Sequence, residues 1–166
     1  LLAHRVAELR AALPAAVELH YAMKANPMPA LVGQMARLVD GIDVASAGEL
    51  ERALTNGGKA SQISFAGPGK RDAELLAAVA AGVLINVESC GEIARLDRLA
   101  QSQGQIARVA VRINPDFELK SAGMRMGGGP KPFGIDAEQV PAALADIGQR
   151  PGLRFEGFHL YAGSQN

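Results

Sequence analysis

Short apolar segments with strand character alternate with helical patterns along the chain, and this alternation limits the fold more than any other feature. Six strands are expected: Val17–Lys24, Ile42–Ala45, Ile63–Ala66, Val83–Val87, Val109–Asn114 and Phe155–Tyr161. Helix starts are marked by capping boxes at Ser46–Glu49, Ser89–Glu92 and Asp136–Gln139. Helix ends are expected at four glycines, Gly57, Gly82, Gly104 and Gly148. Serial strand–helix units of this kind build either a doubly wound parallel sheet or a (β/α)8 barrel.

The two faces of the expected strands differ in polarity, and this difference favours the barrel. In Val109–Asn114, three aliphatic side chains alternate with Ala110, Arg112 and Asn114. A sheet covered by helices on both faces would be apolar on both. In this sequence one face is apolar and the other becomes polar toward the strand ends, as in a barrel whose carboxyl-end mouth carries the chemistry. We therefore expect an α/β fold, a partial TIM barrel with about six of its eight strands present.

The ends of the sequence indicate a piece of a larger domain. The chain starts at Leu1 inside a helical pattern and stops at Tyr161–Asn166, directly after an expected strand. We interpret residues 1–166 as the N-terminal portion of a barrel domain whose last strands are absent. A glycine-rich stretch of about 20 residues between Pro115 and Ile135 follows a strand end, where a lid or substrate loop is plausible.

Composition excludes several classes of partner. Lys and Arg number 17, as do Asp and Glu, and this zero net charge argues against nucleic acid or an anionic membrane. The most apolar stretch, Leu75–Val87, is too short to span a bilayer. The single Cys90 excludes an internal disulfide, fits a reducing compartment and is expected as a small buried side chain. A cytoplasmic protein without a metal site is the resulting expectation.

Lys24 is the strongest candidate for chemistry. It stands at the end of the first expected strand, on the face shared with His20, Ala22 and Asn26. Such a lysine should be only partly exposed, and desolvation lowers the pKa of an amine, which makes it a nucleophile toward carbonyl groups. Position alone leaves open a strand-end lysine that only extends its amine into water.

Seven segments, in order, resemble one family of enzymes. Tyr21-Ala-Met-Lys-Ala-Asn-Pro-Met-Pro-Ala30 resembles the lysine segment of the fold-type III pyridoxal-phosphate decarboxylases, which include ornithine and diaminopimelate decarboxylases. The other six are Asp43–Leu50, Gly67–Lys70, Asn86–Ser89, Arg112–Pro115, Phe133–Gly134 and Gly157–Gln165. These segments are spread in order along nearly the whole chain. The resemblance therefore implies an alanine racemase-like barrel with pyridoxal 5'-phosphate as cofactor.

The resemblance also implies roles for particular residues. Lys24 would hold the cofactor as a Schiff base, release it to the substrate amine and later re-form it. Asp43 would lie beside that Schiff base, Arg112 near the cofactor's oxygens, and Gly163-Ser164 against its phosphate. The residues themselves leave other interpretations open. Asp43 could be a solvated or helix-capping carboxylate, and Arg112 could form a salt bridge to Glu88. Gly163-Ser164 could be an ordinary turn.

Two departures from the family pattern indicate a subgroup. Tyr161 stands where the decarboxylases usually place a histidine stacked on the pyridine ring, and a tyrosine can still stack there. His159 lies two residues earlier on the same face, where it either supplies a polar group or is a satisfied core histidine. The usual Lys-Phe-Gly is Lys131-Pro-Phe-Gly134. These departures resemble decarboxylases of the exosortase A system and those acting on an aminoacyl group held by a carrier protein.

The expected function is therefore decarboxylation of an amino acid or a carrier-bound aminoacyl group by the intact protein, a homodimer on the family pattern. The family's β-sandwich domain would lie beyond residue 166, and residues 1–166 alone would be inactive. Three alternatives stay open: an amino-acid racemase on the same barrel, a non-catalytic pyridoxal-phosphate-binding barrel, and a phosphate-binding barrel without this cofactor. Asn26-Pro27 in place of the racemases' Ala-Tyr-Gly run favours decarboxylation.

Overall fold

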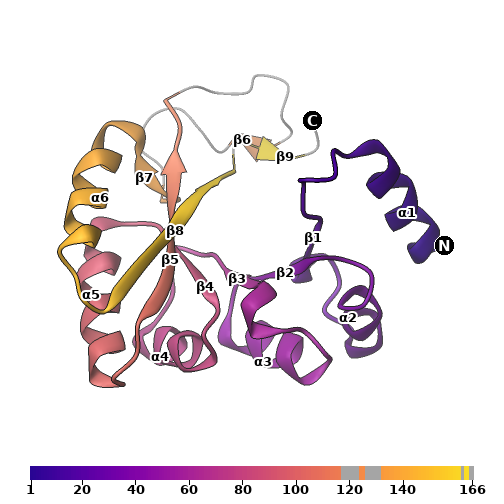
Figure 1. Cartoon of the computed structure of the whole chain (residues 1–166), viewed down its shortest axis with the longest axis horizontal. Coiled ribbons are helices and arrows are strands. Elements are labelled where there is room, and N and C mark those ends of the chain that lie inside the picture. Colours follow the sequence, from indigo (N-terminus) through magenta and orange to yellow (C-terminus); the bar gives the residue numbers. More distant parts are fainter. Residues whose placement is uncertain (117–123, 126–131, 162, 165–166) are drawn as a thin grey trace. The chain divides into compact units, whose positions relative to one another are not determined.

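Parallel strands with helices between them make up both parts of the chain in the computed structural model (Figure 1). The structure describes residues 1–116, 124–125, 132–161 and 163–164. They fall into two units, residues 1–65 and 66–166.

The first unit is a three-stranded parallel sheet with helices. Strands β1 (His20–Ala22), β2 (Gly41–Val44) and β3 (Ile63–Phe65) pair in that order, with Ile42 opposite Tyr21 on one side and Ile63 on the other. The helices are α1 (Leu2–Ala12), α2 (Pro29–Met35) and α3 (Ala47–Thr55), and an ion pair from Arg10 to Asp40 joins α1 to the segment before β2. Its core consists of Met23, Val32, Ile42, Val44, Leu50, Ile63 and Phe65.

The second unit is built around β5 (Ala107–Asn114), which pairs in parallel with β4 (Leu84–Val87), β7 (Ile135–Asp136) and β8 (Leu153–Leu160). Helices α4 (Asp72–Ala81), α5 (Cys90–Ser102) and α6 (Val140–Gly148) accompany these strands, and α5 and α6 lie along β5 and β8 (Figure 1). Two short strands, β6 (Met124–Arg125) and β9 (Gly163–Ser164), form a separate antiparallel pair.

The local helix signals are largely confirmed. The hydroxyls of Ser46 and Ser89 each accept a hydrogen bond from the backbone N–H three residues later, at 3.2 Å. Gly57, Gly82 and Gly104 have the positive φ expected after a helix. The cap expected at Asp136 is wrong, because its carboxylate accepts the side-chain amide of Asn114 and a 3-10 turn, Ala137–Gln139, precedes α6. The prediction that Gly148 follows the end of a helix is also wrong, since it is the last residue of α6 itself.

Two expectations about burial are wrong. A barrel would cover the apolar face of β8 with helices, yet Phe158 and Leu160 on that face are 52 % and 56 % exposed. The described part of the chain contains no helix after β8 that could cover this face. Cys90 does begin α5 as expected, but it is exposed rather than buried, because helix α5 turns other residues toward the core.

Gly134, directly before β7, lies close against the backbone of β5. Its φ is +84°, and a Cβ on it would lie 2.9 Å from the Asn114 nitrogen and 3.0 Å from the Arg112 carbonyl oxygen. Because both neighbours are backbone atoms of β5, they cannot move without disturbing the sheet. We expect Gly134→Ala to lower the free energy of unfolding by about 2–4 kcal/mol in urea titrations.

The matched control for this variant is Gly91→Ala, in helix α5, where an added Cβ meets nothing within 4 Å. Alanine is the better helix former, so this change should be neutral or stabilise by about 0.5–1 kcal/mol. Equal stabilities for the two variants would contradict the close approach of Gly134 to β5.

No helix among the described residues combines the length and the apolar character needed to cross a bilayer.

Candidate functional site

Lys24 lies on a short 3-10 turn, Met23–Ala25, that directly follows β1. The strand expected to continue to Lys24 ends at Ala22, so the prediction of a strand position is wrong. Met23 fills the core of the first unit, whereas Lys24 is exposed rather than partly hidden. The turn ends at Asn26, whose backbone is extended, because the ring of Pro27 disfavours a helical conformation in the residue ahead of it.

Hydrogen bonds fix the segment that follows this lysine. The Tyr21 hydroxyl donates to the Asn26 carbonyl at 2.8 Å, and the Asn26 side chain accepts the Met28 N–H at 3.0 Å. Pro29 then begins α2, at a position where proline costs no hydrogen bond. The exposed residue Lys24 therefore lies between strand β1 and a segment that side-chain hydrogen bonds hold in place.

Asp43 lies on β2, in register with Ala22 of β1. It caps no helix, since Ser46 provides the cap of α3, so the helix-capping alternative is wrong. The Ser64 hydroxyl, from β3, donates to Asp43 Oδ1 at 2.5 Å. The first unit thus places one carboxylate on a strand end and one amine on the adjoining turn.

Arg112 lies on β5 and is nearly buried. Its Nη1 donates to Glu88 Oε2 at 2.9 Å, and the two side chains are 9 % and 1 % exposed. The guanidinium carbon is 5.1 Å from the centre of the Phe133 ring and 5.8 Å from that of Tyr161, within the range of cation–π attraction. The expected salt bridge to Glu88 is present, and it orients the guanidinium between two aromatic rings.

The second unit contains another buried ion pair, between Lys70 and Glu92, which the sequence did not predict. Lys70 Nζ lies 3.0 Å from Glu92 Oε1 and also donates to the Gly67 carbonyl. Glu92 Oε2 accepts the Glu88 N–H at 2.9 Å, while Glu88 Oε1 accepts the Gly67 N–H at 2.5 Å. Burial raises the pKa of Glu92 above its usual value, and Lys70 opposes that rise. The Gly67–Lys70 turn and the two glutamates of the strand-to-helix turn were the available signal.

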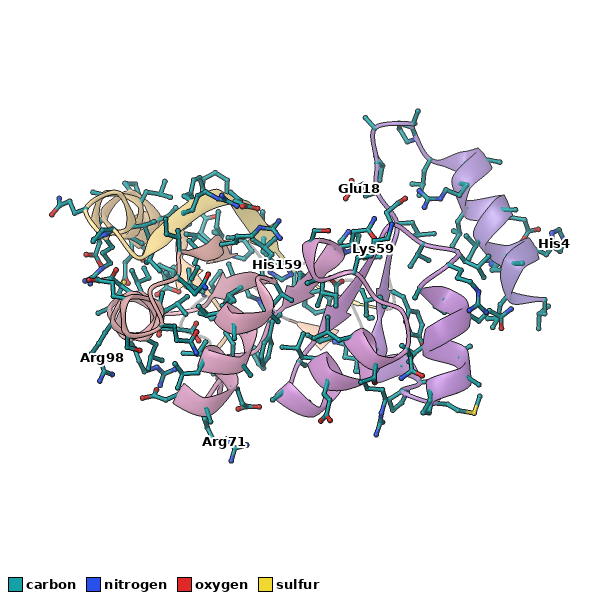
Figure 2. All side chains as sticks on the ribbon, turned by 60° about the horizontal axis from the view of Figure 1, so that its bottom comes forward. His4, Glu18, Lys59, Arg71, Arg98 and His159 are labelled. Carbon is teal, nitrogen blue, oxygen red and sulfur yellow. The ribbon has the colours of Figure 1, made fainter. Side chains whose placement is uncertain are left out.

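β8 and the residue after it bring two more predicted residues to Arg112. His159 is in register with Arg112 across the β5–β8 pair, and it is half-buried on β8 (Figure 2). Tyr161 follows β8 directly and, as above, lies over the guanidinium. Ser164 pairs through its backbone with Met124, and its side chain lies outside the described residues. The Gly127–Gly129 loop also lies outside them.

The polar face of the second unit suits a ligand rich in oxygen acceptors. Asn86, on β4, is 2 % exposed, and its Nδ2 has no hydrogen-bond partner among the described residues. It shares a strand face with Glu88, and register places that face beside Ala110 and Arg112. A buried amide donor costs free energy unless an acceptor satisfies it. The first unit thus carries an amine and a carboxylate, and the second carries cationic and amide donors with aromatic rings.

Comparisons with known proteins agree with this chemistry. The family model described as pyridoxal-dependent decarboxylase, pyridoxal binding domain, matches residues 1–166. An L-glutamyl-(acyl-carrier protein) decarboxylase of Niallia circulans is 38 % identical over 160 residues, which cover 96 % of this chain and 37 % of that protein. A diaminopimelate decarboxylase of Neisseria meningitidis is 37 % identical over 151 residues, covering 87 % of this chain and 36 % of the relative.

A solved structure agrees as well. The crystal structure of diaminopimelate decarboxylase from Helicobacter pylori in complex with L-lysine superposes with a TM-score of 0.91 at 30 % identity, over 98 % of this chain and 42 % of that one. This match confirms the α/β fold class and the partial barrel. The chain spans about two fifths of the length of these relatives. Because the family model matches from the first residue to the last, the chain belongs to the pyridoxal-dependent decarboxylases, as their pyridoxal-binding domain.

Proposed function

We propose that the intact protein is a pyridoxal-phosphate-dependent decarboxylase in which Lys24 holds the cofactor. The observation that supports this most is the exposed residue Lys24 on a turn followed by a segment that Tyr21 and Asn26 fix, in a chain whose whole length matches the pyridoxal-binding domain. When bound, pyridoxal phosphate supplies an aldehyde for an amine and a ring that takes up the electron pair left as carbon dioxide departs.

The chain's own residues then have three tasks. Lys24 binds the cofactor covalently and yields its place to the substrate's amine. Asp43 places a negative charge beside the nitrogen that holds the cofactor, where it would stabilise positive charge on that nitrogen. Arg112, fixed by Glu88 and flanked by Phe133 and Tyr161, offers a cation to the cofactor's oxygens, and Tyr161 takes the position of the family's stacking histidine. His159 adds a polar group on the same face, and Ser164 contacts the phosphate.

The substrate class is an amino acid, free or held by a carrier protein. The names of the relatives support this: diaminopimelate decarboxylase acts on a free diamino acid, and the Niallia circulans enzyme on a glutamyl group attached to a carrier. The intact protein is proposed to be a homodimer. The remaining barrel strands and a β-sandwich domain would follow residue 166, so residues 1–166 alone would lack activity.

Chemical trapping tests this proposal. The full-length protein, loaded with pyridoxal phosphate and reduced with borohydride, should carry a pyridoxyl group on Lys24 in peptide mass spectrometry. Lys24→Ala should abolish both the label and carbon dioxide release, because no other amine takes its position. Lys59→Ala, which removes an exposed lysine elsewhere in the first unit (Figure 2), should leave both unchanged.

The outcomes separate the competing functions. A label on Lys24 with carbon dioxide release from free or carrier-bound amino acids supports the decarboxylase. A label with loss of the substrate's optical activity and no carbon dioxide indicates a racemase, and a label with neither indicates a cofactor-binding barrel. No label at position 24 excludes all three.

A further inference from the structure

Three polar side chains on neighbouring strands of the first unit form a hydrogen-bonded row. His20 on β1 places Nδ1 3.2 Å from Asp43 Oδ1, on β2. The Ser64 hydroxyl, on β3, donates to the same oxygen at 2.5 Å. Two donors from opposite sides therefore converge on one carboxylate oxygen, which limits how the carboxylate can rotate.

The backbone makes room for this arrangement. His20 is in register with Gly41, and a Cβ at position 41 would lie 2.4 Å from His20 Cε1 and 2.6 Å from its Nε2. The Gln62 carbonyl oxygen would lie 2.6 Å from the same Cβ, so the backbone and the His20 ring together fill the space beside Gly41. With glycine there, the imidazole can lie across β2 and reach Asp43. The His20 side chain is 32 % exposed, so the ring is held against the sheet.

We propose that His20 is a positioning residue that, together with Ser64, orients the Asp43 carboxylate toward its work beside the Lys24 amine. This inference rests on the proposed function, because the orientation of Asp43 affects the reaction only if Lys24 holds the cofactor. His20 itself touches neither substrate nor cofactor in this role. It acts through Asp43.

Among the described residues, the charged groups that interact with His20 are carboxylates. Asp43 faces it from β2 and Glu18 from the segment before β1 at 3.6 Å, and Asp40, from the segment before β2, interacts with it through charge. The hydrogen bond to Asp43 raises the pKa of His20 above its usual value, and Glu18 adds to that rise, while burial opposes it. The imidazole thus stays positively charged to a higher pH than a free histidine, and the positive charge beside Asp43 is lost as pH rises through that raised pKa.

The test uses the full-length protein and does not depend on activity alone. The imidazole of His20, assigned in NMR spectra by comparison with His20→Gln, should titrate with a midpoint above that of a free histidine. Asp43→Asn should lower this midpoint by on the order of one pH unit, because it removes the carboxylate in contact with the ring. His4, which is exposed on α1 and has Glu8 as its acidic partner at 3.9 Å, is the internal control, whose ring signals should not respond to Asp43→Asn.

Kinetics provide the second readout. His20→Phe should reduce kcat on the order of tenfold with little change in KM, and remove the corresponding step from the pH profile of kcat, because a misoriented Asp43 impairs chemistry more than binding. His20→Gln keeps a side-chain donor without the charge, so it should restore most of kcat but not the pH step. His4→Gln should change neither.

Two results would overturn the inference. The first is a titration midpoint of His20 that is the same in Asp43→Asn as in the native protein. The second is a folded His20→Phe or His20→Gln variant whose kcat has the wild-type pH profile. Should His20→Phe not fold, His20→Gln and Ser64→Ala carry the test. If borohydride labels Lys24 but the titration midpoint of His20 does not depend on Asp43, only this inference is refuted. If the label is missing, the proposed function is refuted.

Discussion

Lys70→Met lowers the free energy of unfolding of the full-length protein by about 3–5 kcal/mol, the cost expected when one member of a buried ion pair is removed. The side chains of Lys70 and Glu92 are 1 % and 3 % exposed, and Nζ lies 3.0 Å from Oε1. Methionine fills a similar volume without a charge, so the variant leaves the buried Glu92 carboxylate with only a longer ion pair, from Arg95 Nη2 at 3.8 Å. Urea titration measures the loss.

The pH dependence of this variant has a definite sign. Burial already raises the pKa of Glu92 in the native protein, and loss of the lysine removes the charge that opposes the rise. A group with a raised folded pKa contributes stability that is complete below its unfolded pKa and is lost as pH rises through the folded pKa. The deficit of Lys70→Met should therefore shrink in acid, where the buried carboxyl takes up a proton, and grow as pH rises through the raised pKa of Glu92.

Two further variants serve as controls for Lys70. Lys59→Met changes an exposed lysine and should stay within about 0.5 kcal/mol of the native protein. Adding Glu92→Gln to Lys70→Met should recover a large part of the lost stability, since the buried charge is gone. A single variant Lys70→Met that costs less than about 1 kcal/mol would show that this pair is not buried in solution.

Arg112→Met is expected to lower the free energy of unfolding by a similar amount, about 3–5 kcal/mol, and also to weaken the binding of pyridoxal phosphate. Its Nη1 contacts Glu88 Oε2 at 2.9 Å, and the Glu88 side chain is 1 % exposed. Without the guanidinium, Glu88 retains the Gly67 N–H at its other oxygen but no opposite charge in this contact. Urea titration reports the first effect, and a fluorescence titration with the cofactor the second.

Arg112→Lys separates the two effects. A lysine keeps the charge for Glu88 but lacks the planar fork and the stacking on Phe133 and Tyr161. It should recover part of the stability while cofactor affinity stays about 10- to 100-fold below that of the native protein. Arg154→Met, which removes an exposed arginine paired with Glu156 on β8, is the matched control and should leave both quantities nearly unchanged. Native cofactor affinity in Arg112→Met would contradict the proposed role of Arg112.

The two ion pairs should not behave independently. The Glu88 N–H donates to Glu92 Oε2 at 2.9 Å, so the carboxylates of both pairs are anchored on one strand-to-helix turn. The double variant Lys70→Met/Arg112→Met should therefore differ from the sum of the single variants by more than about 0.5 kcal/mol. Additive losses would place the two pairs in separate networks.

Much of the site was predictable, and what was missed follows one rule. The Lys24 segment was recognisable because its lysine, asparagine and prolines are contiguous. The Arg112–Glu88 pair was open as an alternative because both residues fall on the same face of neighbouring expected strands. The Lys70–Glu92 pair was not predicted, since its partners are 22 residues apart and Glu92 had been explained fully as a helix cap. The row from His20 to Ser64 was missed because it depends on the register of three strands.

The sequence by itself determined the order of the six expected strands, the caps at Ser46 and Ser89, and the lysine that marks the family, because each depends on residues only a few positions apart; the short strands β6, β7 and β9 were not predicted. Tertiary structure alone decided that Lys24 lies exposed on a turn, that Cys90 and Phe158 are exposed, and that Lys70 is buried against Glu92. Burial and ion pairing depend on which distant segments pack together. A local pattern specifies the face of a strand but not what covers it.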